Sequence, residues 1–172
     1  MNTEQLLKCI RTDPLLNSCC LGVFPIDRIP KLKGYPECIV VNLDPHSKPG
    51  SHWVAVYIDA EGFGEFFDSY GRSPQKKQLL QFLNVNCLDW TYNDTALQSM
   101  FSSTCGQYCI YYLYYRCRGV PLKQIVDRFC SQDLELNDTK VTTWLNANFD
   151  VDTNVFELDF IVNQICTALS IK

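Results

Sequence analysis

The segment 105–118 reads Cys-Gly-Gln-Tyr-Cys-Ile-Tyr-Tyr-Leu-Tyr-Tyr-Arg-Cys-Arg and is apolar or aromatic on almost every side. A surface helix carries one apolar stripe, so a helix without a continuous polar face has to be enclosed by other elements. Gly119 and Pro121 follow the segment and are typical of a helix end. The sequence therefore predicts a helix that lies buried at the centre of the fold.

Short strands precede this helix and are separated by turn signals at 44–50 and 59–62. We expect strands over residues 38–43, 52–58, 63–67 and 87–92, further helices over residues 3–9, 73–84, 121–130, 140–148 and 156–169, a short turn at Asp13-Pro14, and helix N-caps at Thr3 and Ser73. These elements predict an α+β fold, in which a small, mainly antiparallel sheet packs against several helices. The length suits one domain over residues 1–172.

Composition and charge argue against several classes of protein. The hydrophobic fraction of 47% indicates a packed globular protein, and the net charge of −4 argues against a nucleic-acid-binding face, which is normally basic. We expect no membrane-spanning segment, because no apolar run reaches the roughly 20 residues that a bilayer requires. The first residues lack the plan of a signal peptide, so the sequence predicts a protein that is not secreted.

Ten cysteines are distributed along the chain. Several of them (Cys109, Cys117, Cys130 and Cys166) fall in apolar, helix-like runs, where a free cysteine behaves as a small hydrophobic residue. No CxxC pair occurs, so a zinc ribbon is not expected and we predict no metal site. The sequence therefore indicates a reducing compartment, with most thiols structural and one or two functional.

Cys105 is the candidate nucleophile. It follows a Ser-Ser-Thr loop at the predicted start of the central helix, where the partial positive charge of the helix end would stabilise a thiolate. The N–H groups of Cys105 and Gly106 would face a developing oxyanion, and Gly106 would leave room for substrate. The alternative is a buried structural thiol.

His52 is the candidate base for this thiol. The chain has two histidines, and His46 lies in a Pro- and Gly-rich loop that we expect to be exposed. His52 starts a predicted strand and is followed by Trp53, which can hold the imidazole in place. A thiol–imidazole pair activates the sulfur and later supplies a proton to the leaving group.

Two further side chains would complete such a site. Asp68 ends the strand that would pair with the strand of His52, so its carboxylate can accept the imidazole N–H. Glu65 is the competing carboxylate, and we expect it to face solvent. Gln98 lies seven residues before Cys105, and its amide can donate to the oxyanion. Taken singly, each of these residues also fits a turn or a polar loop.

In this order, His52-Trp53, Asp68, Gln98 and Cys105-Gly106 resemble the adenovirus protease (adenain) family, whose clan also includes SUMO-deconjugating proteases. The segment 97–109 looks like proteases of adenovirus-like DNA viruses and of Polinton/Maverick transposons. The resemblance covers about residues 38–119. It implies that Cys105 is the nucleophile, His52 the base, Asp68 the orienting acid and Gln98 the oxyanion donor. Asp68 stands where adenovirus protease has glutamate, although aspartate is usual elsewhere in the clan.

The resemblance implies a cysteine endopeptidase that matures viral capsid and core precursors by cutting after small, glycine-containing motifs. It further implies a monomer that works in the host nucleus or cytoplasm and in the virion. In adenovirus protease a cysteine upstream of the nucleophile forms a disulfide with an activating viral peptide, and Cys87 matches its spacing. The adenovirus enzyme also uses DNA as a cofactor, but this acidic chain departs from that, so we expect no DNA dependence and no required cofactor.

Three other functions fit the same residues. A deconjugase that removes ubiquitin-like modifiers would use the same chemistry and also cut after glycine. An inactive relative would only bind glycine-ended tails, and a bacterial effector of this clan would transfer an acetyl group from coenzyme A. The sequence separates these alternatives poorly, since they share the same side chains.

Overall fold

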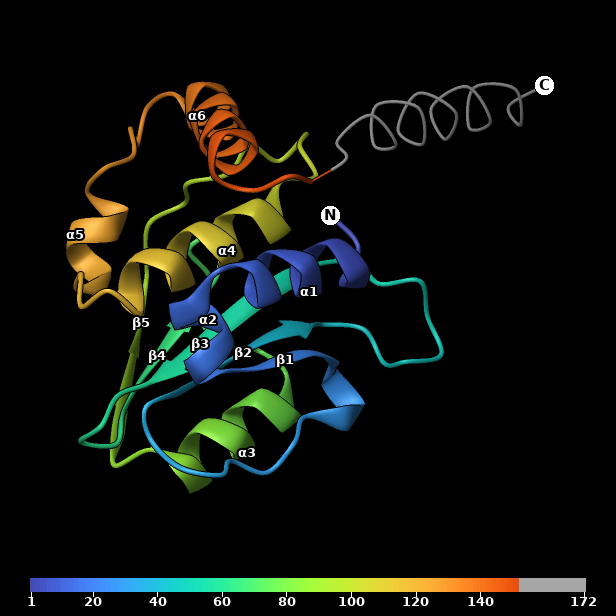
Figure 1. The fold of residues 1–172 in the computed structure, drawn as a ribbon, viewed down its shortest axis with the longest axis vertical. Coiled ribbons are helices and arrows are strands. Elements are labelled where there is room, and N and C mark those ends of the chain that lie inside the picture. Colours follow the sequence, from blue (N-terminus) through green and yellow to red (C-terminus); the bar gives the residue numbers. More distant parts are fainter. Residues whose placement is uncertain (152–172) are drawn as a thin grey trace.

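The computed structural model describes residues 1–151, in which helices cover both faces of a five-stranded sheet (Figure 1). In chain order the elements are α1 (Thr3–Thr12), α2 (Pro14–Cys19), β1 (Cys20–Pro25), the 3₁₀ helix η1 (Ile26–Arg28), β2 (Glu37–Asn42), β3 (Trp53–Ile58), β4 (Phe63–Phe67), α3 (Lys77–Asn86), β5 (Asp89–Tyr92), α4 (Cys105–Arg116), α5 (Leu122–Val126) and α6 (Leu134–Asn148). None of the described helices combines the length and the apolar character that a bilayer crossing requires.

The sheet is mixed, with the strands in the order β1-β2-β3-β4-β5. The two inner pairings, β2 with β3 and β3 with β4, are antiparallel, whereas the edge strands β1 and β5 pair in parallel. A parallel pair needs a crossover connection, and α3 provides it between β4 and β5. The strands predicted over residues 38–43, 52–58 and 63–67 therefore form the antiparallel middle of the sheet, and the parallel edge strands are joined to it by crossover connections.

Alternating strand residues separate the core into two layers. Phe67 on β4 stacks on Tyr112 of α4, with ring centroids 4.6 Å apart, and belongs to the core that also contains α1 and α6. Its neighbour Phe66 points to the other side, where Leu79 and Leu83 of α3 cover the sheet. Figure 1 shows this division, with α1 and α4 on one face and α3 on the opposite face.

The predicted central helix and the α+β class are confirmed. Tyr108 and Tyr112 of α4 are fully buried, as a helix with apolar residues on every side requires. Glu65 was predicted to face solvent, and this is wrong. Its carboxylate accepts hydrogen bonds from the Tyr112 hydroxyl at 2.7 Å and from Arg116 at 2.9 Å, so it is tied to the central helix.

Several boundaries differ from the sequence-based prediction. Asn2, not Thr3, caps α1, because its side chain and that of Gln5 form a reciprocal capping box. No side chain caps α3, which begins after Lys76 and not at Ser73. β1 is a strand that the pattern did not indicate. The helix predicted over residues 156–169 lies outside the described residues, as does Cys166.

Candidate active site

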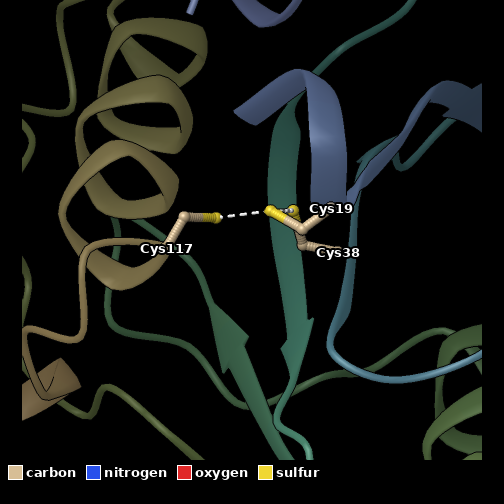
Figure 2. Close-up of side chains that lie close together, drawn as sticks. All are labelled: Cys19, Cys38 and Cys117. Atoms are coloured by element: carbon tan, nitrogen blue, oxygen red, sulfur yellow. Dashed lines mark hydrogen bonds between the residues drawn. The ribbon is translucent and has the colours of Figure 1, made fainter. Parts of the chain in front are cut away.

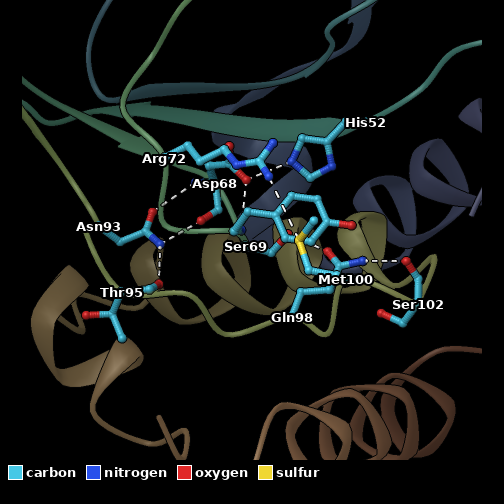
Figure 3. Close-up of polar contacts among 10 residues, drawn as sticks. His52, Asp68, Ser69, Arg72, Asn93, Thr95, Gln98, Met100 and Ser102 are labelled. Carbon is cyan, nitrogen blue, oxygen red and sulfur yellow. Dashed lines mark hydrogen bonds and ion pairs between the residues drawn. The ribbon is translucent and has the colours of Figure 1, made fainter. Parts of the chain in front are cut away.

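His52 and Asp68 meet because of the register of the sheet. His52 immediately precedes β3 and Asp68 immediately follows β4, and in an antiparallel pair the start of one strand lies beside the end of the other. The His52 Nε2 atom lies 2.7 Å from the Asp68 Oδ1 atom (Figure 3). Since Nε2 bonds the carboxylate, the Nδ1 atom of the same ring is left for the thiol.

Hydrogen bonds from neighbouring residues hold both the backbone and the carboxylate of Asp68. The Asn93 side chain accepts from the Asp68 backbone N–H at 2.9 Å and donates to its carbonyl at 2.6 Å. The backbone N–H of Tyr70 donates to Oδ1 at 2.9 Å, and the Tyr70 ring stacks on the imidazole with centroids 4.8 Å apart. The acid and the base therefore have fixed positions before any substrate binds.

Cys105 is the first residue of α4 and is 8% exposed. No side chain caps this helix end, and the hydroxyl of the N-cap residue Thr104 is directed toward Asp138, to which it donates at 2.8 Å. The first N–H groups of α4 are therefore available to another acceptor. A helix end with free N–H groups favours negative charge, both on the sulfur and on an oxyanion beside it.

The ionisation of the two groups is coupled. Burial disfavours the imidazolium, but the hydrogen bond to Asp68 and the contact with Cys105 raise the pKa of His52 to about 9. Burial likewise disfavours the thiolate, yet the His52 imidazole lowers the pKa of Cys105 below its usual range. Near neutral pH, these shifts favour a thiolate–imidazolium pair, the reactive form of a cysteine nucleophile.

The side-chain amide of Gln98 is held in one orientation by hydrogen bonds, although the residue lies in a loop. It is 1% exposed, its Oε1 atom accepts from the Ser69 hydroxyl at 2.6 Å, and its Nε2 atom donates to the Ser102 carbonyl at 3.0 Å (Figure 3). A side-chain amide has two N–H groups, so one remains for a ligand. The two serine contacts fix which end of the amide carries these donors.

Helix α6 holds the loop that carries Gln98. The Asp138 carboxylate accepts from the Ser99 backbone N–H at 3.2 Å, from Thr104 and from the Tyr108 hydroxyl at 3.0 Å. The neighbouring Asn137 donates to the Leu97 carbonyl at 3.1 Å. The loop between β5 and α4 is therefore anchored at both ends by one turn of α6.

A cleft of about 700 Å³ leads from Cys105 past Trp53 to the loop 44–51. Met1 borders it, and the Met1 carbonyl accepts from the Trp53 indole N–H at 3.0 Å. Gly106 was expected to leave room for substrate. The structure gives another reason for this glycine, because a Cβ atom there would lie 3.0 Å from Met1 Cβ and 3.4 Å from the Trp53 ring.

The chain is similar to several viral proteins. It is 25% identical over 130 residues to a protease of ovine adenovirus D, covering 65% of this chain and 63% of the relative. It is 32% identical over 98 residues to a cysteine protease of African swine fever virus, covering 51% and 36%. It is 29% identical over 102 residues to an Acanthamoeba polyphaga mimivirus protein named as a thiol protease, covering 54% and 33%.

The chain is homologous to viral cysteine proteases. It spans less than two thirds of the length of each of these relatives. No protein-family model matches it. Among solved structures, the African swine fever virus protease aligns with a TM-score of 0.43 and 22% identity over 60% of this chain and 43% of the other.

Two residues singled out by the sequence lie outside the group formed by His52, Asp68 and Cys105, although His46 borders the far end of the cleft. His46 is exposed, as predicted, and its Nδ1 atom lies 2.6 Å from Asp27 Oδ2. Cys87 follows α3 and packs against the core layer that this helix covers, and burial raises the pKa of its thiol to about 11. The described part of the chain shows no partner for Cys87, so its link to an activating peptide stays a prediction.

The sequence did not reveal the residues that support the site. Asn93 is 25 residues from Asp68 and lies in a polar loop, and Asp138 is 34 residues from Thr104 in a different helix. Neither residue belongs to a local motif. The one signal available was that α6 places Asn137 and Asp138 side by side on an otherwise ordinary helix, which does not identify their acceptors or donors.

Proposed function

We propose that this chain is a cysteine endopeptidase with Cys105 as nucleophile, His52 as acid and base, Asp68 as the group that orients His52, and Gln98 as an oxyanion donor. The observation that carries the proposal is the His52–Asp68 hydrogen bond of 2.7 Å beside a thiol whose pKa His52 lowers. The homology to viral cysteine proteases supports the same chemistry.

In the first step the Cys105 thiolate attacks the scissile carbonyl, and the carbonyl oxygen takes up the electron pair. In this proposal the free N–H groups at the start of α4 and the remaining amide N–H of Gln98 receive the oxyanion. The His52 imidazolium then donates its proton to the leaving amine as the C–N bond breaks. The product is a thioester on Cys105 and a new amino terminus.

The second step regenerates the thiol. Neutral His52 accepts a proton from water as the water oxygen attacks the thioester, and the new carboxylate product leaves. Asp68 holds the ring throughout and stabilises the imidazolium each time it forms. The Tyr70 ring, stacked on His52, limits rotation of the imidazole between the two steps.

We propose that the substrate residues next to the scissile bond are small, typically glycine. The nucleophile is almost fully buried, and the approach to it through the cleft passes Met1 and Trp53, which are themselves joined by a hydrogen bond. A large side chain would have to displace one of them. Precursors of viral capsid and core proteins are the substrates that this specificity and the viral homologues favour.

The test is hydrolysis of matched peptides that differ only in the residues before the scissile bond. A peptide with two glycines there should be cut, with about 10²-fold or greater loss when leucine replaces the last glycine, because the buried approach excludes the larger side chain. Cys105→Ala should abolish cleavage. Equal cleavage of both peptides would contradict the proposed specificity, and cleavage by Cys105→Ala would contradict the mechanism.

The competing functions give different results in the same assay. A deconjugase would react much faster with a SUMO or ubiquitin C-terminal probe than with short peptides. An inactive tail-binding protein would bind glycine-ended peptides without turnover, and an acyltransferase would transfer acetyl groups from coenzyme A. Any of these results in place of peptide cleavage would replace the proposed function.

Cofactor use is part of the same proposal. We propose that the enzyme acts as a monomer in the infected cell and the virion, without DNA, and that Cys87 would be the site of a disulfide if an activating peptide is used. The net charge of −4 supports DNA independence. Full activity without any peptide, unchanged in Cys87→Ser, would remove the activating-peptide part of the proposal and leave the catalytic part intact.

A further inference from the structure

Three cysteine sulfurs converge at the end of α4 that is remote from Cys105 (Figure 2). Cys19 is the last residue of α2, Cys38 lies on β2, and Cys117 follows the last residue of α4. The Cys19 sulfur lies 2.8 Å from that of Cys117 and 3.9 Å from that of Cys38, and all three lie within 4.8 Å of one another.

This cluster is separate from the candidate active site. Cys117 is 12 residues after Cys105, which corresponds to about 18 Å along a helix. The cysteines come from three elements that are far apart in sequence, so no local motif brings them together. The absence of a CxxC pair, which led the sequence to predict no metal site, therefore does not bear on this assembly.

The cluster is largely enclosed by the fold. Cys38 is 2% exposed and its partner on β3 is Tyr57, whereas Cys19 and Cys117 are partly buried. The Arg116 guanidinium stacks on the Tyr57 ring at 4.3 Å, and its charge is balanced by Glu65 at 2.9 Å.

We propose that Cys19, Cys38 and Cys117 bind one thiophilic d¹⁰ cation, Zn²⁺ or Cu⁺, through three sulfur ligands. A metal–sulfur bond of about 2.3 Å places ligand sulfurs roughly 3.7–4.0 Å apart. The Cys19–Cys38 distance of 3.9 Å falls in this range, the Cys19–Cys117 distance of 2.8 Å is shorter, and all three sulfurs lie within 4.8 Å of one another. A disulfide would use two of the three sulfurs and leave the third without a role.

Binding has two consequences for the protein. Each thiol that coordinates the cation gives up its proton to solvent, so metal affinity decreases as the pH is lowered. The cation would also join α2, β2 and the end of α4, and a ligand that binds only the folded chain raises its stability. The helix that carries the nucleophile would thus be fixed at its far end.

The test uses the full chain with Cys105→Ser, so that the candidate nucleophile cannot bind the metal. The reduced, metal-free protein is titrated with Zn²⁺ against a chromogenic chelator, and separately with Cu⁺. We expect one ion per chain and a higher unfolding temperature. Adding Cys117→Ser or Cys38→Ala should weaken binding at least about 100-fold, because a three-ligand site loses one ligand. Cys130→Ser, which changes an exposed cysteine, should bind as the parent does.

A second measurement does not depend on these variants folding. In the full chain with Cys105→Ser, saturating Zn²⁺ should protect Cys19, Cys38 and Cys117 from alkylation by N-ethylmaleimide. It should not protect Cys130. Peptide mass spectrometry would show which thiols react. No bound ion, or binding without protection of these three thiols, would overturn the proposal. So would a Cys19–Cys117 disulfide formed with glutathione disulfide in a chain that takes up no metal when reduced.

Discussion

Gln98 is the side chain whose contribution is easiest to isolate, because its contacts to Ser69 and Ser102 already fix the amide. Gln98→Ala should lower kcat by about 10²–10³ with little change in KM, since the lost donor serves the oxyanion and not the bound substrate. Steady-state cleavage of the diglycine peptide measures both constants. Gln75→Ala, on an exposed glutamine, is the control, and an equal effect in both variants would exclude the assigned role.

Asp68 should determine the alkaline limit of activity. The pKa of His52 lies near 9, so activity should be present below that pH and should fall as His52 loses its proton above it. Asp68→Asn removes the carboxylate that helps to raise this pKa, so the alkaline limb should move to lower pH and kcat should fall. The kcat–pH profile of both proteins checks this, and an unshifted limb in the variant would contradict the assignment.

At the scale of residues, the sequence indicated the candidate catalytic side chains but not the residues that hold them in position. His52, Asp68 and Cys105 stand at strand ends and at a helix start, and Gln98 lies in the loop before that helix, positions that order and spacing can reveal. Asn93 gives no comparable signal, because its role depends on a backbone 25 residues away. Long-range hydrogen bonds of this kind follow from the tertiary structure and not from a local pattern.

At the scale of elements, α6 positions the loop before the nucleophile. Asp138→Ala leaves the Ser99 N–H without its acceptor and removes one of the two partners of the Thr104 and Tyr108 hydroxyls, which keep Ser102 and the Leu97 carbonyl. Buried unpaired donors are costly, so the free energy of unfolding should fall by about 2–4 kcal/mol. Released from Asp138, the Thr104 hydroxyl could also cap α4 and compete with the oxyanion, lowering kcat.

Urea denaturation and peptide cleavage measure these two effects of Asp138→Ala. Glu135→Ala, on the exposed side of the same helix, should change neither by more than about 0.5 kcal/mol or twofold. If Asp138→Ala were as stable and as active as the control, α6 would have no part in holding the loop.

The elements themselves were predicted with uneven success, for physical reasons. Residues 63–67 and the start of α4 at Cys105 follow from strong apolar patterns and were placed correctly. β1 was missed because Gly22, at a φ of 133°, and Pro25 interrupt its pattern. α6 starts at Leu134, six residues earlier than predicted, because the Asp133 side chain caps it by accepting from the Leu136 N–H.

At the scale of the whole molecule, the net negative charge predicts that DNA does not stimulate the enzyme. With a net charge of −4, the chain should gain little from binding a polyanion, so added duplex DNA should change the cleavage rate by less than about twofold at low salt. A salt titration with and without DNA measures this. A large stimulation that disappears as salt increases would contradict it.

Catalysis in this protein depends on activation of the Cys105 sulfur by His52. The most direct measurement is the rate of iodoacetamide alkylation of each cysteine as a function of pH, followed by peptide mass spectrometry, which separates Cys105 from the other cysteines. In the parent chain, Cys105 should react rapidly at pH 7. In His52→Ala the main cause that lowers its pKa is lost while burial still raises it, so the reaction at that pH should be at least about tenfold slower. Slow labelling of Cys105 that is the same with and without His52 would contradict the account.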